Sequence, residues 1–239
     1  AASRELLQAL LKTGKPVVLV LFTGRPLALK SEQERVPAIL NVWFGGTESG
    51  LAIADVLFGK VNPSGKLTTT WPQSVGQVPL YYNHKNTGRA LKPGAGWEKF
   101  RSNYLDISND PLYPFGYGMS YSDFSYSDVK LDKSRARGNQ TVTASVTVSN
   151  RGSLDGKEVV QLYLRSMVGS ITRPVKELKG FQKILVKAGE STTVSFTLTP
   201  EDLKFYNSDL KYDWEPGEFV VMIGGNSRDV KSAPLHWDR

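Results

Sequence analysis

The apolar residues of this chain follow two different patterns, and the change falls near residue 123. In the first part, short apolar runs occupy residues 17–22 (VVLVLF) and, interrupted only by Asn41, 38–43 (AILNVW). Runs of this length and β-branched content are typical of parallel strands that are covered on both faces. We therefore expect two adjacent parallel strands. A sheet of so few strands has a bare edge, which predicts self-association or poor solubility of the chain unless its later part covers that edge.

Helical periodicity flanks these two runs. Residues 3–12 (SRELLQALLK) repeat leucine at a spacing that predicts an amphipathic helix. Residues 51–58 predict a second helix, with Thr47 or Ser49 as its cap and Gly59 as its left-handed end. The first part is therefore expected to be a partial α/β sandwich, in which helices flank a parallel sheet.

A turn and a third strand are predicted at the end of this part. Residues 62–65 (NPSG) combine four residues that favour turns. Residues 66–71 (KLTTTW) follow with three consecutive threonines, which are enriched in strands. We place the boundary of this α/β domain at residue 80.

After residue 123 the sequence alternates between apolar and polar positions, as half-buried strands do. Glycine-rich turns separate the alternating stretches, and residues 200–203 (PEDL) predict one capped helical turn. Seven or so strands in this length predict an all-β domain, a sandwich of immunoglobulin or fibronectin type III kind, over residues 123–239. The predicted strands lie at 124–131, 141–148, 159–164, 177–186, 192–198 and 218–223.

Between the two domains, residues 81–122 have no regular periodicity and are rich in tyrosine, asparagine, glycine and proline. Long irregular segments inside compact proteins are usually functional or wrapped over a neighbour. We expect this crossing segment to lie along both domains. Its aromatic residues suit either a rim for sugar binding or the joint between the domains, and the sequence leaves both open.

The composition argues against several classes of function. The 239 residues include no cysteine and two histidines, and they carry a formal charge of +7. The lysines and arginines are scattered, so we expect no nucleic-acid partner. The two histidines lack a spaced set of further ligands, and neither phosphate-loop nor dinucleotide spacing occurs, so we expect no metal and no cofactor. No apolar run is long enough to cross a membrane.

Four strings of residues carry a family resemblance. They are WFGGTESGLAIADVLFGKVNPSGKLTTTWP at 43–72, GKPVVLVLFTGRP at 14–26, PLYPFGYGMSY at 111–121 and YNHKNTGR at 82–89. Together they resemble the C-terminal part of family 3 glycoside hydrolases, the bacterial β-glucosidase and β-xylosidase type. The chain departs from the family pattern at Gly45, Ser49 and Ala90, all in loops.

The resemblance implies a retaining O-glycosyl hydrolase that acts on β-linked oligosaccharides and is periplasmic or secreted. It places the aspartate nucleophile on an N-terminal (β/α)8 barrel and the acid/base glutamate in the sandwich domain ahead of Ala1. No residue of this chain matches either motif, so we name none as catalytic and expect residues 1–239 alone to be inactive. The partners expected are that barrel and the start of the sandwich domain. A carbohydrate-binding or adhesive β-sandwich module is the alternative.

Three polar residues of the crossing segment are candidates for substrate contact. Asn83, His84 and Arg89 offer donors and an acceptor beside Tyr82, in a loop that Thr87-Gly88 can turn tightly. In the alternative interpretation they only join the domains. Arg25, after the first strand, is a possible ligand contact or a brace for its loop. For Glu48 we favour a structural role at the start of the second helix.

Overall fold

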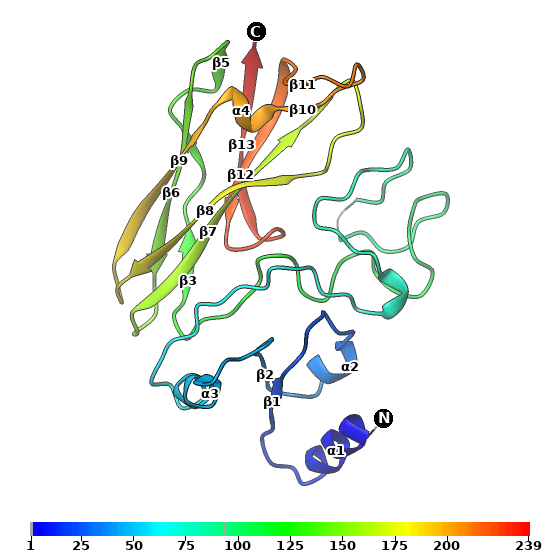
Figure 1. The fold of residues 1–239 in the computed structure, drawn as a ribbon, viewed down its shortest axis with the longest axis vertical. Coiled ribbons are helices and arrows are strands. Elements are labelled where there is room, and N and C mark those ends of the chain that lie inside the picture. Colours follow the sequence, from blue (N-terminus) through cyan, green and yellow to red (C-terminus); the bar gives the residue numbers. More distant parts are fainter. Residues whose placement is uncertain (1, 93) are drawn as a thin grey trace.

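The computed structural model describes residues 2–92 and 94–239, and it divides the chain into an α/β region below, a β-sandwich above and a crossing segment between them (Figure 1). The α/β region contains α1 (Ala2–Leu11), β1 (Val18–Leu21), α2 (Lys30–Gln33), β2 (Ala38–Asn41) and α3 (Ser49–Leu57). Strands β1 and β2 are parallel neighbours in register from Val18 opposite Ala38 to Leu21 opposite Asn41. The predicted pair of parallel strands is confirmed, each slightly shorter than its apolar run.

The start of α3 differs from the prediction. Its N-cap residue is Glu48, not Thr47 or Ser49, and no side-chain cap hydrogen bond forms among the described residues. Gly59 follows the helix with φ +76°, a left-handed conformation that a glycine adopts without strain. The predicted end of the helix is therefore confirmed.

The apolar side chains of the α/β region are poorly covered. Neither α1 nor α3 contains a buried residue in the part of the chain that the structure describes. Phe22, Phe44 and Phe58 are exposed by 64%, 85% and 88%. Each of the two strands also pairs only with the other within residues 2–92 and 94–239. Within the described residues, the region thus has two open strand edges and two helices whose apolar side chains are at most partly covered.

The expected strand over residues 66–71 is wrong as a regular element. This stretch runs beside residues 112–117, and a single β-bridge joins Trp71 to Tyr113. Further along, Leu67 accepts a hydrogen bond from Gly116 N at 2.7 Å and donates one to Tyr117 O at 2.8 Å. The partner stretch contains Pro114, which has no N–H, and Gly116 has φ +81°. A continuous ladder cannot form along such a stretch.

The sandwich has two sheets, as predicted. One has the strand order β5-β13-β12-β7-β8, and in the other β6 pairs with β3, β4 and β9. The strands are β3 (Phe124–Tyr126), β4 (Lys130–Leu131), β5 (Arg135–Arg137), β6 (Val142–Asn150), β7 (Gly156–Ser166), β8 (Glu177–Val186), β9 (Ser191–Leu198), β12 (Gly217–Gly224) and β13 (Val230–Asp238), and a small hairpin pairs β10 (Phe205–Tyr206) with β11 (Tyr212–Asp213).

The sandwich core is formed by alternate residues of the facing strands. In β6 the burial alternates without interruption from Val142 to Asn150, and one apolar cluster joins both sheets, including Leu162, Ile223 and Trp237. The helical turn α4 (Pro200–Leu203) follows Thr199, whose N–H donates to Asp202 Oδ2 at 2.7 Å, which is one half of the predicted cap. This closed core stands in contrast to the open α/β region.

The prediction of the sandwich strands was wrong at residues 124–131 and missed β5, β10, β11 and β13. The expected strand 124–131 is divided into β3 and β4, because the Ser127 hydroxyl accepts the hydrogen bond of Thr147 N and interrupts the ladder. Strand β13 was missed altogether because Pro234 and polar residues obscure its alternation. Strand β5 pairs only with residues 236–238, so Pro234 has a neighbouring strand on one side alone, where proline is tolerated.

Candidate functional site

The loop from Tyr81 to Arg89 leaves the α/β region and runs along the sandwich. Asn83, His84 and Arg89 are all exposed, as a role in contacting a ligand requires. His84 folds back on its own turn, with ring Nδ1 3.2 Å from Tyr81 O. The structure brings Asn83 and His84 together at the base of the loop, whereas Arg89 lies further on, where its carbonyl accepts from Ser102 N at 2.8 Å.

Tyr82 fixes the base of this loop. Its ring stacks on Phe115 with centroids 4.5 Å apart and meets the edge of Tyr163 of β7 at 5.8 Å. Its hydroxyl accepts a hydrogen bond from Leu178 N of β8 at 3.3 Å. The sequence pointed to Tyr82 only as a neighbour of the candidates. Its partners lie far along the chain, and local patterns cannot reveal such contacts.

The rest of the crossing segment carries exposed apolar side chains. Trp97, Phe100 and Leu105 are exposed by 59%, 70% and 86%. Side-chain amides hold the surrounding turns: Asn103 Oδ1 accepts from Glu98 N at 2.9 Å, and Asn109 Nδ2 donates to Ser102 O at 2.8 Å. The segment is therefore ordered by its own polar groups while it presents aromatic surface outward, as a binding rim would.

Arg25 and Glu48 lie on the opposite part of the chain, after β1 and before α3. Thr23 Oγ1 donates to Arg25 O at 2.9 Å and so holds the tight turn, while the Arg25 side chain is exposed beside a shallow hollow of about 450 Å³. Glu48 is exposed at the N-cap of α3, where a carboxylate favours the positive end of the helix dipole. Its position agrees with the expected structural role.

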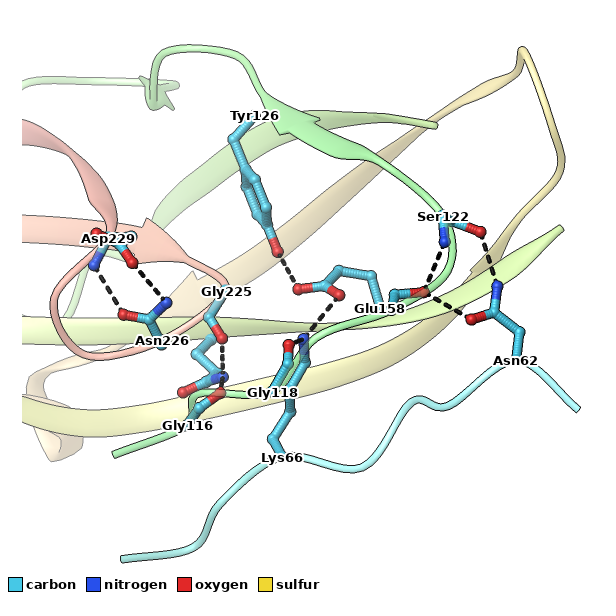
Figure 2. A network of polar contacts seen from close by, with 12 residues as sticks. Asn62, Lys66, Gly116, Gly118, Ser122, Tyr126, Glu158, Gly225, Asn226 and Asp229 are labelled. Atoms are coloured by element: carbon cyan, nitrogen blue, oxygen red, sulfur yellow. Dashed lines mark hydrogen bonds and ion pairs between the residues drawn. The ribbon is translucent and has the colours of Figure 1, made fainter. Parts of the chain in front are cut away.

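A buried ion pair joins the α/β region to the sandwich (Figure 2). Lys66 Nζ lies 3.0 Å from Glu158 Oε2, with the two side chains exposed by 11% and 5%. Lys66 also donates to Gly118 O at 2.7 Å, and the Tyr126 hydroxyl donates to Glu158 Oε1 at 3.0 Å. Burial, and next the negative charge of Glu158, raise the pKa of Tyr126 far above its usual value. Every oxygen of Glu158 is therefore occupied, and this carboxylate is structural.

Asn62, from the predicted turn, forms the second half of the junction (Figure 2). Its Nδ2 donates to Ser122 Oγ at 2.8 Å and to Asp155 O at 2.9 Å, and its Oδ1 accepts from Ser120 Oγ and Tyr121 N at 2.9 Å each. One amide thus joins the turn, the end of the crossing segment and the β6–β7 loop. These polar contacts help to hold the sandwich on the α/β region.

The described residues offer little for other chemistry. No group of three or more metal-ligating side chains occurs among residues 2–92 and 94–239. A groove of about 580 Å³ is lined by α1, α2 and residues 73–75, where Arg4 pairs with Glu32 at 2.7 Å. In the described part of the chain, no helix is long and apolar enough to span a membrane.

Comparison with known proteins decides the family. The model of the glycosyl hydrolase family 3 C-terminal domain matches residues 1–121, and that of the fibronectin type III-like domain matches residues 158–227. The chain belongs to glycosyl hydrolase family 3. Both the resemblance and the order of an α/β domain followed by a fibronectin type III-like sandwich are confirmed.

The relatives are glycosidases. The chain is 54% identical over 230 residues to a periplasmic β-glucosidase of Salmonella typhimurium and 44% identical over 234 residues to a β-xylosidase of Formosa agariphila, covering 96% and 97% of this chain and 30% and 31% of those proteins. The crystal structure of a β-glucosidase from Listeria innocua superimposes with a TM-score of 0.95 at 45% identity, covering 100% of this chain and 33% of that one. The chain thus spans about a third of the family 3 enzymes that it matches.

The aromatic residues at the far end of the sandwich bear on the alternative interpretation, a carbohydrate-binding or adhesive β-sandwich module. Tyr206 and Tyr212 are exposed by 65% and 57%, but their rings are tilted by 47° with centroids 5.1 Å apart. This cross-strand pair does not form the flat platform that a sugar ring would stack on. The sandwich instead packs its loops against the α/β region, as a structural domain of a family 3 enzyme would.

Proposed function

We propose that this chain is the C-terminal portion of a β-glycosidase, most closely a β-glucosidase, that hydrolyses β-linked oligosaccharides with retention of configuration. The observation that carries the proposal is the match of the whole chain to a third of each related glucosidase and xylosidase. The uncovered helices and strand edges of the α/β region support it, because they are surfaces for a further part of the protein. A (β/α)8 barrel and the remainder of the sandwich domain would provide that cover.

Within the full-length enzyme, the role of residues 1–239 is to support the fold and to contact the substrate. A retaining glycosidase needs two carboxyl groups about 5–5.5 Å apart across the bond to be cleaved. Glu158 is occupied by Lys66 and Tyr126, and the pair Glu218 and Asp238 holds His236 between its carboxylates. The family resemblance places the catalytic pair outside these residues, on the N-terminal barrel and in the sandwich domain ahead of Ala1, so we expect residues 1–239 alone to hydrolyse no aryl β-glucoside.

The first test is an assay of the full-length protein. We expect turnover of aryl β-glucosides, with the β-anomer as the first product seen by proton NMR. Residues 1–239 purified alone should show none. An inactive full-length protein, or an α-anomer as first product, would overturn the proposal. A periplasmic or secreted location is part of the same proposal, supported by the name of the Salmonella relative.

The loop Tyr81–Arg89 is proposed to contact the leaving-group side of the substrate. Asn83, His84 and Arg89 present an amide, an imidazole and a guanidinium to solvent beside the exposed ring of Tyr81. Such groups suit the hydroxyls and faces of a pyranose. Because the barrel would hold the sugar being cleaved, this loop would bind the sugar that departs.

Substrates of two lengths test this contact. In the full-length enzyme, His84→Ala or Arg89→Ala should raise KM for a β-linked disaccharide or trisaccharide about tenfold, with kcat for an aryl glucoside nearly unchanged. Arg151→Ala is the matched control, since Arg151 is an exposed arginine in the turn between β6 and β7. A lower melting temperature with unchanged KM for both substrates would instead show that these residues only join the domains.

A further inference from the structure

Gln161 of β7 has a buried side-chain amide, on the face of its sheet that points away from the sandwich core. It is 4% exposed and faces the crossing segment, while its neighbours Val160 and Leu162 belong to the core. Its Nε2 donates to Gly225 O at 2.6 Å and to Gly116 O at 3.3 Å, and its Oε1 accepts from the Tyr163 hydroxyl at 2.6 Å. Figure 2 shows Gly116 and Gly225, whose carbonyls accept these two bonds, close to each other. One side chain thus joins β7, the β12–β13 turn and the crossing segment.

Gly116 approaches Gln161 too closely for a Cβ atom to fit without displacing the amide. A Cβ atom added there would overlap all three terminal atoms of the Gln161 amide, and the φ of +81° at Gly116 disfavours other residues independently. Ser227 N donates to the neighbouring Phe115 O at 2.8 Å. The crossing segment is therefore fixed on the sandwich at one register.

This register sets the position of Tyr82. Phe115, next to Gly116, provides the face on which Tyr82 stacks, and Tyr163, which donates to Gln161, provides the edge that Tyr82 meets. Val175 N also donates to His84 O at 3.0 Å. In the described part of the chain, the hydrogen bonds that residues 82–85 make beyond their own turn all go to the sandwich.

We propose that Gln161 is a positioning residue, which acts through Phe115 and Tyr163 on Tyr82 and thereby holds the loop Tyr81–Arg89 where it meets substrate. The fibronectin type III-like domain thus determines how the enzyme binds the leaving group. The substrate part of this inference rests on the proposed function of the loop; the positioning part rests on the contacts alone.

The test uses Gln161→Met in the full-length enzyme, because methionine keeps the length of the side chain and removes its hydrogen-bonding groups. We expect backbone amides of residues 82–90 to exchange with deuterium about tenfold faster. KM for a β-linked disaccharide should rise, with kcat for an aryl glucoside unchanged. Val194→Ala, a core substitution in the other sheet, is the control: it should lower the melting temperature without faster exchange in the loop.

The two readouts separate the two claims. Faster loop exchange with a raised KM supports both. Faster exchange with an unchanged KM supports the positioning role and contradicts the proposed substrate contact. Unchanged exchange in Gln161→Met, or equally fast exchange in Val194→Ala, overturns the positioning role.

Discussion

The sandwich and the α/β region both contain apolar residues in regular patterns, yet they bury them to different extents. The sandwich joins its apolar residues into one core that runs from Val129 to Trp237. In the described part of the α/β region and crossing segment, the buried apolar residues are Leu29, Val36 and Trp71. A regular apolar pattern thus predicts that a surface will be covered, but the covering residues need not lie in the same stretch of chain.

The largest expected difference between the regions is in the cost of losing one aromatic ring. Trp237 is fully buried, so Trp237→Ala should destabilise the sandwich by about 3–5 kcal/mol. Phe58 is 88% exposed, so Phe58→Ala in residues 1–239 should change the free energy of unfolding by less than about 0.5 kcal/mol. Urea unfolding followed by tryptophan fluorescence measures both. A similar loss in both variants would contradict the contrast.

The junction between the regions should be nearly as sensitive. Lys66→Met leaves the buried carboxylate of Glu158 without its cation, which should cost about 3 kcal/mol. The double variant Lys66→Met with Glu158→Gln should cost clearly less than the sum of the single variants, because the unpaired charge is gone. Differential scanning calorimetry of all three variants forms the cycle. Additive losses would show that the two side chains do not act as a pair.

The two regions should also differ in self-association, and we expect the free energies involved to be smaller than those of the two preceding substitutions. The open edges of β1 and β2, together with exposed Phe44 and Phe58, favour contact between copies of residues 1–239. We expect oligomers in light scattering at micromolar concentration, and Phe44→Ser with Phe58→Ser should reduce them. A double substitution on the sandwich surface, Tyr206→Ser with Tyr212→Ser, is the control. A monomeric, high-melting sample would contradict this prediction.

The smallest effect concerns pH and lies within the sandwich. His236 lies between Glu218, at 2.5 Å, and Asp238, at 2.9 Å, and hydrogen bonds to these carboxylates raise its pKa above the usual 6.5. The stabilisation is therefore complete below about pH 6.5, where the unfolded histidine is also protonated, and is lost as the pH rises through the raised pKa.

Melting temperatures of the wild type and His236→Gln test this effect. Their difference should shrink as the pH rises from 6.5, and added salt should reduce it because the site is partly exposed. A constant difference across that range would show that the ion pairs of His236 do not contribute.

The local pattern of apolar and polar residues correctly predicted those elements whose burial depends on their own sequence alone. Strand β6 alternates between the core and the other side at every residue, and its sequence shows the same period. The missed β13 and the wrongly expected strand over 66–71 both depend on their neighbours. Proline fits β13 because β5 is short, and a threonine-rich stretch fails as a strand because its partner contains proline and a left-handed glycine.

The candidate site, too, was predictable only where local sequence pattern was sufficient. The exposed polar residues Asn83, His84 and Arg89 follow from composition and resemblance, and their contact with substrate stays a prediction. The residues that fix the loop could not be found, because Tyr82 meets Tyr163 and Gln161 meets Gly116 across long separations in sequence. Glu158 could not be recognised as buried either, since its partner Lys66 lies in another domain.

Asn62 has a consequence for how the protein ages. Asparagine usually loses its amide when the backbone nitrogen of the next residue attacks the side chain and forms a succinimide. The next residue here is Pro63, whose nitrogen carries no hydrogen and cannot complete that ring. An aspartate at this position would lose the two bonds that Nδ2 donates to Ser122 and Asp155. The dipeptide Asn-Pro therefore makes the turn and also protects the amide that holds the domains together from chemical decay.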